Sequence, residues 1–87
     1  MRLPTRISLP FGYAVTVKQV SDTEMLEEQE EEERAEVVDG LWDVDNRTIF
    51  VRRSLSLRRK RYILGHEMCH ALADWIHDCL NEEAMKP

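Results

Sequence analysis

The sequence reads Ile-Leu-Gly-His-Glu-Met-Cys-His-Ala-Leu from residue 63 to residue 72, an H-E-x-x-H motif inside an apolar run. On an α-helix, residues four apart lie one above the other, so the rings of His66 and His70 can converge on one ion. Glu67 follows the first histidine and is turned about 100° round the helix, near the open side of that ion. The stretch therefore predicts a helix that carries two zinc ligands and a general base.

These residue types suit the hydrolysis of amides. A catalytic zinc site has three protein ligands and an open position for water, whose pKa falls to about 7. Glu67 can take a proton from that water and pass it to the leaving amine, so no covalent intermediate is needed. The alternative is that two surface histidines and a glutamate share a helix by chance.

The motif helix is expected to have a site face and a core face. The site face, within about 80° of His66, holds His70, Ile63, His77 and Asp74. Gly65 is expected to pack closely against a strand or loop backbone, because glycine costs about 1 kcal/mol relative to alanine in a helix interior. The core face is expected to consist of Leu64, Met68, Cys69, Ala71, Leu72, Trp75, Ile76 and Cys79.

Length, charge and cysteine content limit the class of protein. The 87 residues support one domain, which spans residues 1–87. The net charge of −5 disfavours nucleic acids and anionic membranes as partners. Cys69 and Cys79 are about 15 Å apart on one helix, so they are interpreted as reduced core residues. With no signal peptide or membrane span in the sequence, we expect a soluble, cytoplasmic protein without a membrane partner.

Two charged segments lie on either side of the hairpin region. Residues 24–36 contain eight glutamates and one arginine, whereas residues 47–61 contain six arginines, one lysine and no acid. The acidic segment 21–36 is predicted to be a solvated helix capped by Ser21 or Asp22, or else a flexible insertion. A functional alternative places it across the zinc cleft. The basic stretch 52–61 is interpreted as a solvated face that balances the acidic segment, with nucleic-acid contact less favoured.

About three strands are expected before the motif helix. Residues 1–10 contain Pro4 and Pro10 and are expected to be irregular. Residues 11–20 alternate as a strand does, and residues 37–44 and 48–53 are expected to form a hairpin around the turn 43–47. The exposed edge of that hairpin offers backbone groups to an extended peptide. The side chains expected on one face of the strand are Tyr13, Val15 and Val17, with Gln19 as a further candidate. In the hairpin they are Leu41, Ile49 and Val51, with Trp42 and Phe50 on the other face.

The motif helix is predicted to begin after Ser54 or Ser56 and to reach about Leu80. Such a helix is about 39 Å long, which exceeds the width of a domain of this size, so we expect a bend or an end. The fold class is therefore predicted to be α+β. A small sheet of about three strands packs on the long helix, and a short helix or turn follows.

This order of elements resembles small gluzincin-type zinc metallopeptidases, including the minigluzincins, and more distantly the ImmA/IrrE-type peptidases. The resemblance rests on the Gly-x-x-Asp hairpin, Asn-Arg-Thr-Ile-Phe-Val, the charged helix start and the H-E-x-x-H stretch, and it covers residues 11–20 and 37–83. It implies one Zn²⁺ per chain, with His66 and His70 as ligands and Glu67 as general base and acid. It also implies a third ligand, a downstream glutamate, for which Glu83 is favoured over Glu82 because an alanine follows it.

Other sources of the third ligand stay open. They are Asp74, the acidic segment and a partner subunit, although Asp74 can equally orient a ligand or be a plain surface acid. For Glu83 to reach the ion, the chain has to reverse between His77 and Asn81, because a continuous helix places it about 20 Å beyond His70. The metzincin pattern is disfavoured, since Ala73 and Ile76 occupy the positions of its glycine and third histidine.

The sequence thus predicts a zinc-dependent peptidase that acts on peptides or proteins. The second hypothesis is a zinc-stabilised binding or regulatory module without catalytic activity. A nucleic-acid-associated protein is the least favoured of the three. The oligomeric state does not follow from the sequence.

Overall fold

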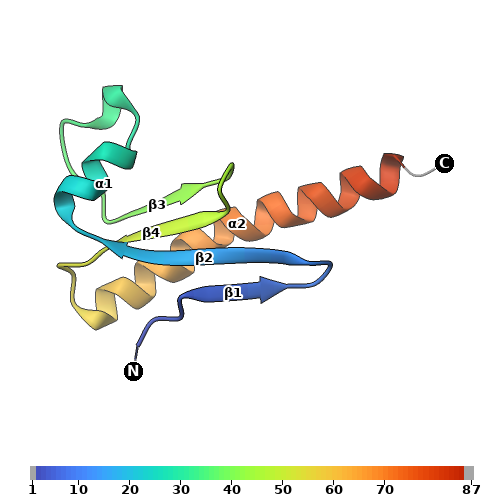
Figure 1. Ribbon diagram of the computed structural model, residues 1–87, viewed down its shortest axis with the longest axis horizontal. Helices are drawn as coiled ribbons and strands as arrows, with labels where there is room; N and C mark the ends of the chain where they lie inside the picture. The colour runs from blue at the N-terminus through green and yellow to red at the C-terminus, as the bar shows by residue number, and fades with distance from the viewer. Residues whose placement is uncertain (1, 86–87) are drawn as a thin grey trace.

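The computed structural model describes the backbone of residues 2–85 and the side chains of residues 2–81. A four-stranded sheet in the order β1-β2-β4-β3 packs on one long helix, α2 (Figure 1). The expected α+β class is therefore confirmed, with four strands rather than three. In chain order the elements are β1 (Arg6–Leu9), β2 (Tyr13–Val20), α1 (Asp22–Glu28), the 3₁₀ turn η1 (Glu31–Glu33), β3 (Gly40–Asp43), β4 (Thr48–Arg52) and α2 (Leu57–Met85).

The additional strand is β1, in the region expected to be irregular. It pairs antiparallel with β2, with Ile7 opposite Val15. Pro4 and Pro10 lie just outside this four-residue strand, and β1 is at the edge of the sheet, where prolines are tolerated. A tight turn follows, in which Phe11 and Gly12 have φ values of 68° and 75°.

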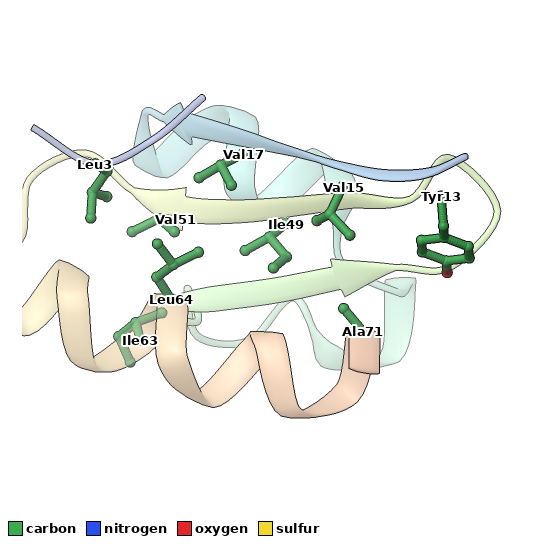
Figure 2. Close-up of a cluster of buried hydrophobic side chains, with 9 residues drawn as sticks. All are labelled: Leu3, Tyr13, Val15, Val17, Ile49, Val51, Ile63, Leu64 and Ala71. Atoms are coloured by element: carbon green, nitrogen blue, oxygen red, sulfur yellow. The ribbon is translucent and has the colours of Figure 1, made fainter. Parts of the chain in front are cut away.

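The main core lies between β2, β4 and α2 (Figure 2). β2 and β4 are parallel, with Val17 opposite Ile49. Tyr13, Val15 and Val17 are at most 5% exposed, so the predicted inward face is confirmed for these three residues, whereas Gln19, the further candidate, is exposed. The buried members of this core are Leu3, Tyr13, Val15, Val17, Ile49, Val51, Ile63, Leu64 and Ala71.

The expected hairpin is formed by β3 and β4. The Asp43 carboxylate closes its turn by accepting hydrogen bonds from the backbone N–H groups of Asp45 and Asn46 at 3.1 and 3.3 Å. Asp43 pairs with Thr48, which brings Trp42 opposite Ile49 and Leu41 opposite Phe50. The predicted faces of Leu41 and Trp42 are therefore wrong, because directly paired residues share a face of the sheet. Trp42 packs on the main core toward α2.

The acidic segment packs on the other face of the sheet. Met25 of α1 is fully buried against Val20 and Phe50, and Ser21 caps the helix by accepting a hydrogen bond from the Glu24 N–H at 3.2 Å. The side-chain amide of Gln29, 2% exposed, donates to the carbonyls of Glu33 and Glu36 at 2.7 and 2.9 Å. The described segment is therefore ordered by a small core and a buried amide, on the sheet face opposite α2.

Helix α2 is continuous from Leu57 to Met85 and projects past the end of the sheet (Figure 1). Ser56 caps it, since its Oγ accepts a hydrogen bond from the Arg59 N–H at 3.2 Å and its carbonyl accepts from the Lys60 N–H at 2.9 Å. The expected bend, chain reversal and separate C-terminal helix are absent from the described backbone. From residue 71 to residue 85 there is no glycine or proline, so no local signal interrupts the helix.

Candidate metal centre

The two histidines of the motif lie side by side on an exposed face of α2. The ring centroids of His66 and His70 are 5.4 Å apart, and the ring planes meet at 78°. Two imidazoles bound to one tetrahedral zinc ion at about 2.1 Å have centroids roughly 5 Å apart. The donor chemistry and the spacing of this pair therefore fit two of the ligand positions of a zinc ion.

Glu67 lies between α2 and the edge strand β3 and is only 8% exposed. A Cβ atom added to Gly40 of β3 would contact the Ile63 side chain and lie 3.2 Å from Cγ and 3.5 Å from Oε1 of Glu67. The absence of a side chain at Gly40 is what lets the edge strand approach the helix here. Around Gly65, by contrast, no atom other than those of the adjoining α2 backbone would lie within 4 Å of an added Cβ, so the expected close packing at that glycine is wrong.

The rotation of α2 differs from the expected one. Ile63, expected on the site face, is buried together with Leu64, Glu67 and Ala71. Met68 and Trp75 pack against the core as expected, and Cys79 is partly buried. The expected core residues Cys69, Leu72 and Ile76 are instead exposed, the last two at 36% and 50%.

Asp74 is the acceptor of the hydrogen bond that ties β3 to the helix one turn beyond His70. The Trp42 indole Nε1 donates to its Oδ2 at 2.6 Å. The role of Trp42 could not be predicted, because the sequence pattern had placed its side chain on the opposite face of the hairpin. Glu67 and Asp74 thus contact β3 on either side of His70, and β3 forms one wall of the candidate site.

Within the side chains that the structure describes, no group of three or more His, Cys, Asp and Glu residues is placed to hold a metal ion. The side chains of Glu82 and Glu83 lie outside that range. The backbone of α2 places residue 83 thirteen positions after His70, about 20 Å along the axis. Glu83 therefore joins the two histidines only when the last turns of the helix refold.

Part of the basic stretch is held in ion pairs. Arg52 bonds the Asp22 carboxylate through Nε at 2.7 Å and the Asp39 carboxylate through Nη1 at 3.2 Å, and Arg59 also pairs with Asp39 at 3.2 Å. The hydrogen bond from Arg52 lowers the pKa of Asp22, and the two carboxylates raise the pKa of Arg52. These pairs link β4 and the start of α2 to the start of α1.

In comparisons with known proteins, no family model, no curated protein and no solved structure matches this chain. None of the helices within the described residues is both long and apolar enough to cross a membrane.

Proposed function

We propose that this protein is a zinc-dependent peptidase whose metal is held by His66 and His70. The observation that carries the proposal is the 5.4 Å separation of the two imidazole centroids on the open face of α2, with Glu67 next to them in the sequence. When bound, zinc lowers the pKa of a water ligand and polarises a substrate carbonyl.

In this proposal Glu67 moves the proton. Its carboxylate accepts a proton from the attacking water and then donates it to the leaving amine. The burial of Glu67 against Gly40 restricts its side chain to the gap between α2 and β3. A carboxylate in that gap faces a peptide bond that approaches along β3.

The edge strand offers a place for the substrate backbone. β3 is the last strand of the sheet and pairs only with β4 among the described strands. An extended peptide can add to such an edge through main-chain hydrogen bonds. Trp42 and Gly40 hold this edge against the helix next to His70 and Glu67, so a peptide added there lies beside the two histidines.

Charge near the edge strand favours basic substrates. A groove of about 300 Å³ lies beside β3 next to the end of α1, which packs on the sheet face opposite α2, and it is lined by the acidic residues Glu28, Glu30, Asp43 and Asp45, together with Leu41, Trp42 and Val44. Side chains of an extended peptide paired with β3 alternate between the two faces of the sheet, so every second one reaches this groove. Four carboxylates attract lysine and arginine side chains and repel acidic ones. We therefore expect peptides rich in lysine or arginine to be cleaved in preference to acidic peptides of the same length.

The third zinc ligand is assigned to Glu83, as the resemblance to gluzincins implies. This assignment requires the exposed end of α2 to fold back, and Glu82, Asp74, the acidic segment and a partner subunit stay as alternatives. Asp74 already accepts the Trp42 hydrogen bond, and α1 lies on the opposite face of the sheet. Replacing Glu83 with alanine is expected to weaken zinc retention, whereas unchanged retention would exclude it.

The decisive experiment compares zinc content and peptide cleavage in the parent and in Glu67→Gln, which preserves the size of this buried side chain. We expect one zinc per chain in both proteins and cleavage only by the parent. His70→Ala is expected to lose the zinc, and His77→Ala, which removes an exposed histidine two turns further along α2, serves as the matched control and retains both properties. Equal cleavage by the parent and Glu67→Gln would show that this glutamate is not the base.

The alternative function is a zinc-stabilised binding module. It is favoured by the continuity of α2 through residue 85, which keeps the proposed third ligand away from the histidines in this structure. Zinc binding without cleavage of any peptide in a basic or acidic library would select this alternative. Loss of zinc binding in the parent itself would exclude both functions.

A further inference from the structure

The apolar side chains exposed on α2 form a row on the side of the helix that faces away from the sheet. Tyr62, Leu72 and Ile76 are 64%, 36% and 50% exposed, and Cys69 is exposed between them. With Gly65, these residues follow one another at spacings of 3, 4, 3 and 4. This is the a/d pattern of two helices that pack along a common seam. The residues of α2 that face the sheet, such as Leu64, Glu67 and Ala71, lie on the other side.

We propose that this row is the interface of a homodimer in which two α2 helices pack antiparallel. Extended at the same spacing to positions 58, 79 and 83 of the helix backbone, it is called here the α2 seam (residues 58, 62, 65, 69, 72, 76, 79 and 83). A two-fold axis between residues 70 and 71 makes the seam self-complementary, as a C2 interface requires. Cys69 then faces Leu72 of the second copy, and Tyr62 faces Cys79. This inference does not depend on the proposed function.

The open space at Gly65 supports this register. Opposite Gly65 the second copy places Ile76, the most exposed of the central aliphatic side chains. Apart from the adjoining backbone of α2, no atom lies within 4 Å of where a Gly65 Cβ would be. A groove of about 320 Å³ opens beside it, lined mainly by apolar residues, including Leu3, Ile7 and Met68, together with Arg2 and Arg61. The Ile76 side chain of the second copy fits in this space. Its insertion explains why a glycine is present here, although glycine destabilises a helix interior by about 1 kcal/mol relative to alanine.

The charges at the two ends of α2 favour a second copy of this chain as the partner at the seam, in the antiparallel arrangement. The first turns of α2 contain Arg58, Arg59, Lys60 and Arg61, whereas its last turns contain Glu82 and Glu83. Arg59 and the nearby Asp78 are paired within the chain, with Asp39 and Arg47, so the complementary charges are those of the other residues. A parallel pair would bring like charges together at both ends. The antiparallel pair brings the basic end of each helix beside the acidic end of the other, with position 58 opposite position 83 at both ends of the seam.

The dimer also explains why the end of α2 is helical beyond the sheet. An isolated helical extension of about ten residues is marginal in water, because most helix stability comes from packing. A second α2 covers Leu72 and Ile76, which are 36% and 50% exposed in the single chain. His66 and His70 lie on a different side of the helix from the seam, so the seam leaves both imidazoles uncovered. The straight α2 of the dimer excludes the fold-back that would bring Glu83 to the ion, so dimerisation competes with a zinc site that is completed by Glu83 of the same chain.

The test is the molar mass of the full chain by size-exclusion chromatography with light scattering, in a chelating buffer so that zinc plays no part. At about 100 µM we expect twice the chain mass of 10.3 kDa, with dissociation on dilution. Ile76→Glu is expected to raise the dimer dissociation constant at least about tenfold. Phe11→Glu, which charges an 86% exposed side chain outside the seam, is the matched control and leaves it unchanged.

Two further variants test the register. Gly65→Leu places its Cβ in open space in the single chain and is expected to leave the circular dichroism unchanged while weakening the dimer. Arg58→Glu is expected to weaken the dimer, and the double variant Arg58→Glu/Glu83→Arg is expected to restore it. A monomeric parent at about 100 µM, or equal effects of Ile76→Glu and Phe11→Glu, would overturn the proposed interface. If the double variant dimerises as weakly as Arg58→Glu alone, the antiparallel register is wrong.

Discussion

The indole Nε1 of Trp42 and the carboxylate Oδ2 of Asp74 are joined by a hydrogen bond of 2.6 Å. This bond connects the edge strand β3 to α2 one turn beyond His70. Hydrogen bonds with a charged acceptor are shorter and stronger than those between neutral groups. Together with the close approach of Gly40 to Glu67, it determines how far the edge strand lies from the two histidines.

Removing the indole N–H of Trp42 is expected to weaken the packing of β3 on α2. Trp42→Phe keeps an aromatic ring but leaves the Asp74 carboxylate without its indole partner, so we expect the free energy of unfolding to fall by about 1–2 kcal/mol. Asp74→Asn retains an acceptor oxygen, so we expect it to lower the free energy of unfolding by less than Trp42→Phe does. Urea denaturation followed by circular dichroism measures both losses. Amide hydrogen exchange in β3 is expected to accelerate in Trp42→Phe but not in Trp75→Phe, whose indole bonds the Pro10 carbonyl instead.

Alanine substitutions of Gly40, in β3 beside α2, and of Gly65, within α2, are expected to change stability in opposite directions. Gly40→Ala places a methyl group against Ile63 and Glu67, so it forces β3 away from the helix and is expected to destabilise the fold by about 1–3 kcal/mol. Gly65→Ala meets open space and is expected to stabilise the single chain by up to about 1 kcal/mol. Thermal denaturation at low protein concentration compares the two. A loss of stability in Gly65→Ala as large as that in Gly40→Ala would show that the helix is packed differently.

Zinc is expected to stabilise the folded chain through His66 and His70. A ligand that binds only the folded state adds about 2.7 kcal/mol when its concentration is one hundred times the dissociation constant. We therefore expect the melting temperature to rise with added zinc and to return to the metal-free value with a chelator. His66→Ala and His70→Ala are expected to abolish the rise. His77→Ala is expected to keep it, and an equal loss in all three variants would point to nonspecific binding by surface histidines.

Local patterns were sufficient to predict most of the sheet and the start of the long helix. The alternation of Tyr13, Val15 and Val17 predicted a half-buried strand, and Asp43 to Arg47 predicted the turn of the hairpin, because both depend on side chains that are near in sequence. The faces of Leu41 and Trp42 were predicted wrongly. They depend on which residue of β4 pairs with Asp43, and a shift of one position exchanges the two faces.

The rotation and the length of α2 depend on contacts that sequence spacing does not contain. The apolar residues of this helix cover more of its circumference than the sheet can bury, so the pattern predicted Cys69, Leu72 and Ile76 as core when the structure exposes them. Gly40, rather than Gly65, is the glycine that admits a close neighbour. Only the approach of β3 distinguishes the two. The spacing of His66 and His70 within one helix, by contrast, follows from helix geometry alone.

Acidification is expected to weaken the junction between α1 and β4. Arg52 hydrogen bonds both carboxylate oxygens of Asp22, at 2.7 and 3.0 Å, and this lowers the pKa of Asp22 from its ordinary value of 3.8. Because the folded-state pKa is the lower one, the contribution of this pair is present above pH 3.8 and is lost as the pH falls through the folded-state value. Asp22→Asn is therefore expected to be less stable than the parent at pH 7, and the difference is expected to shrink below pH 3.8.

Urea denaturation across this pH range measures the difference in the free energy of unfolding, with Glu28→Gln in the same helix as the control. A difference between parent and Asp22→Asn that does not change with pH would show that the lost contact is not the ionic pair.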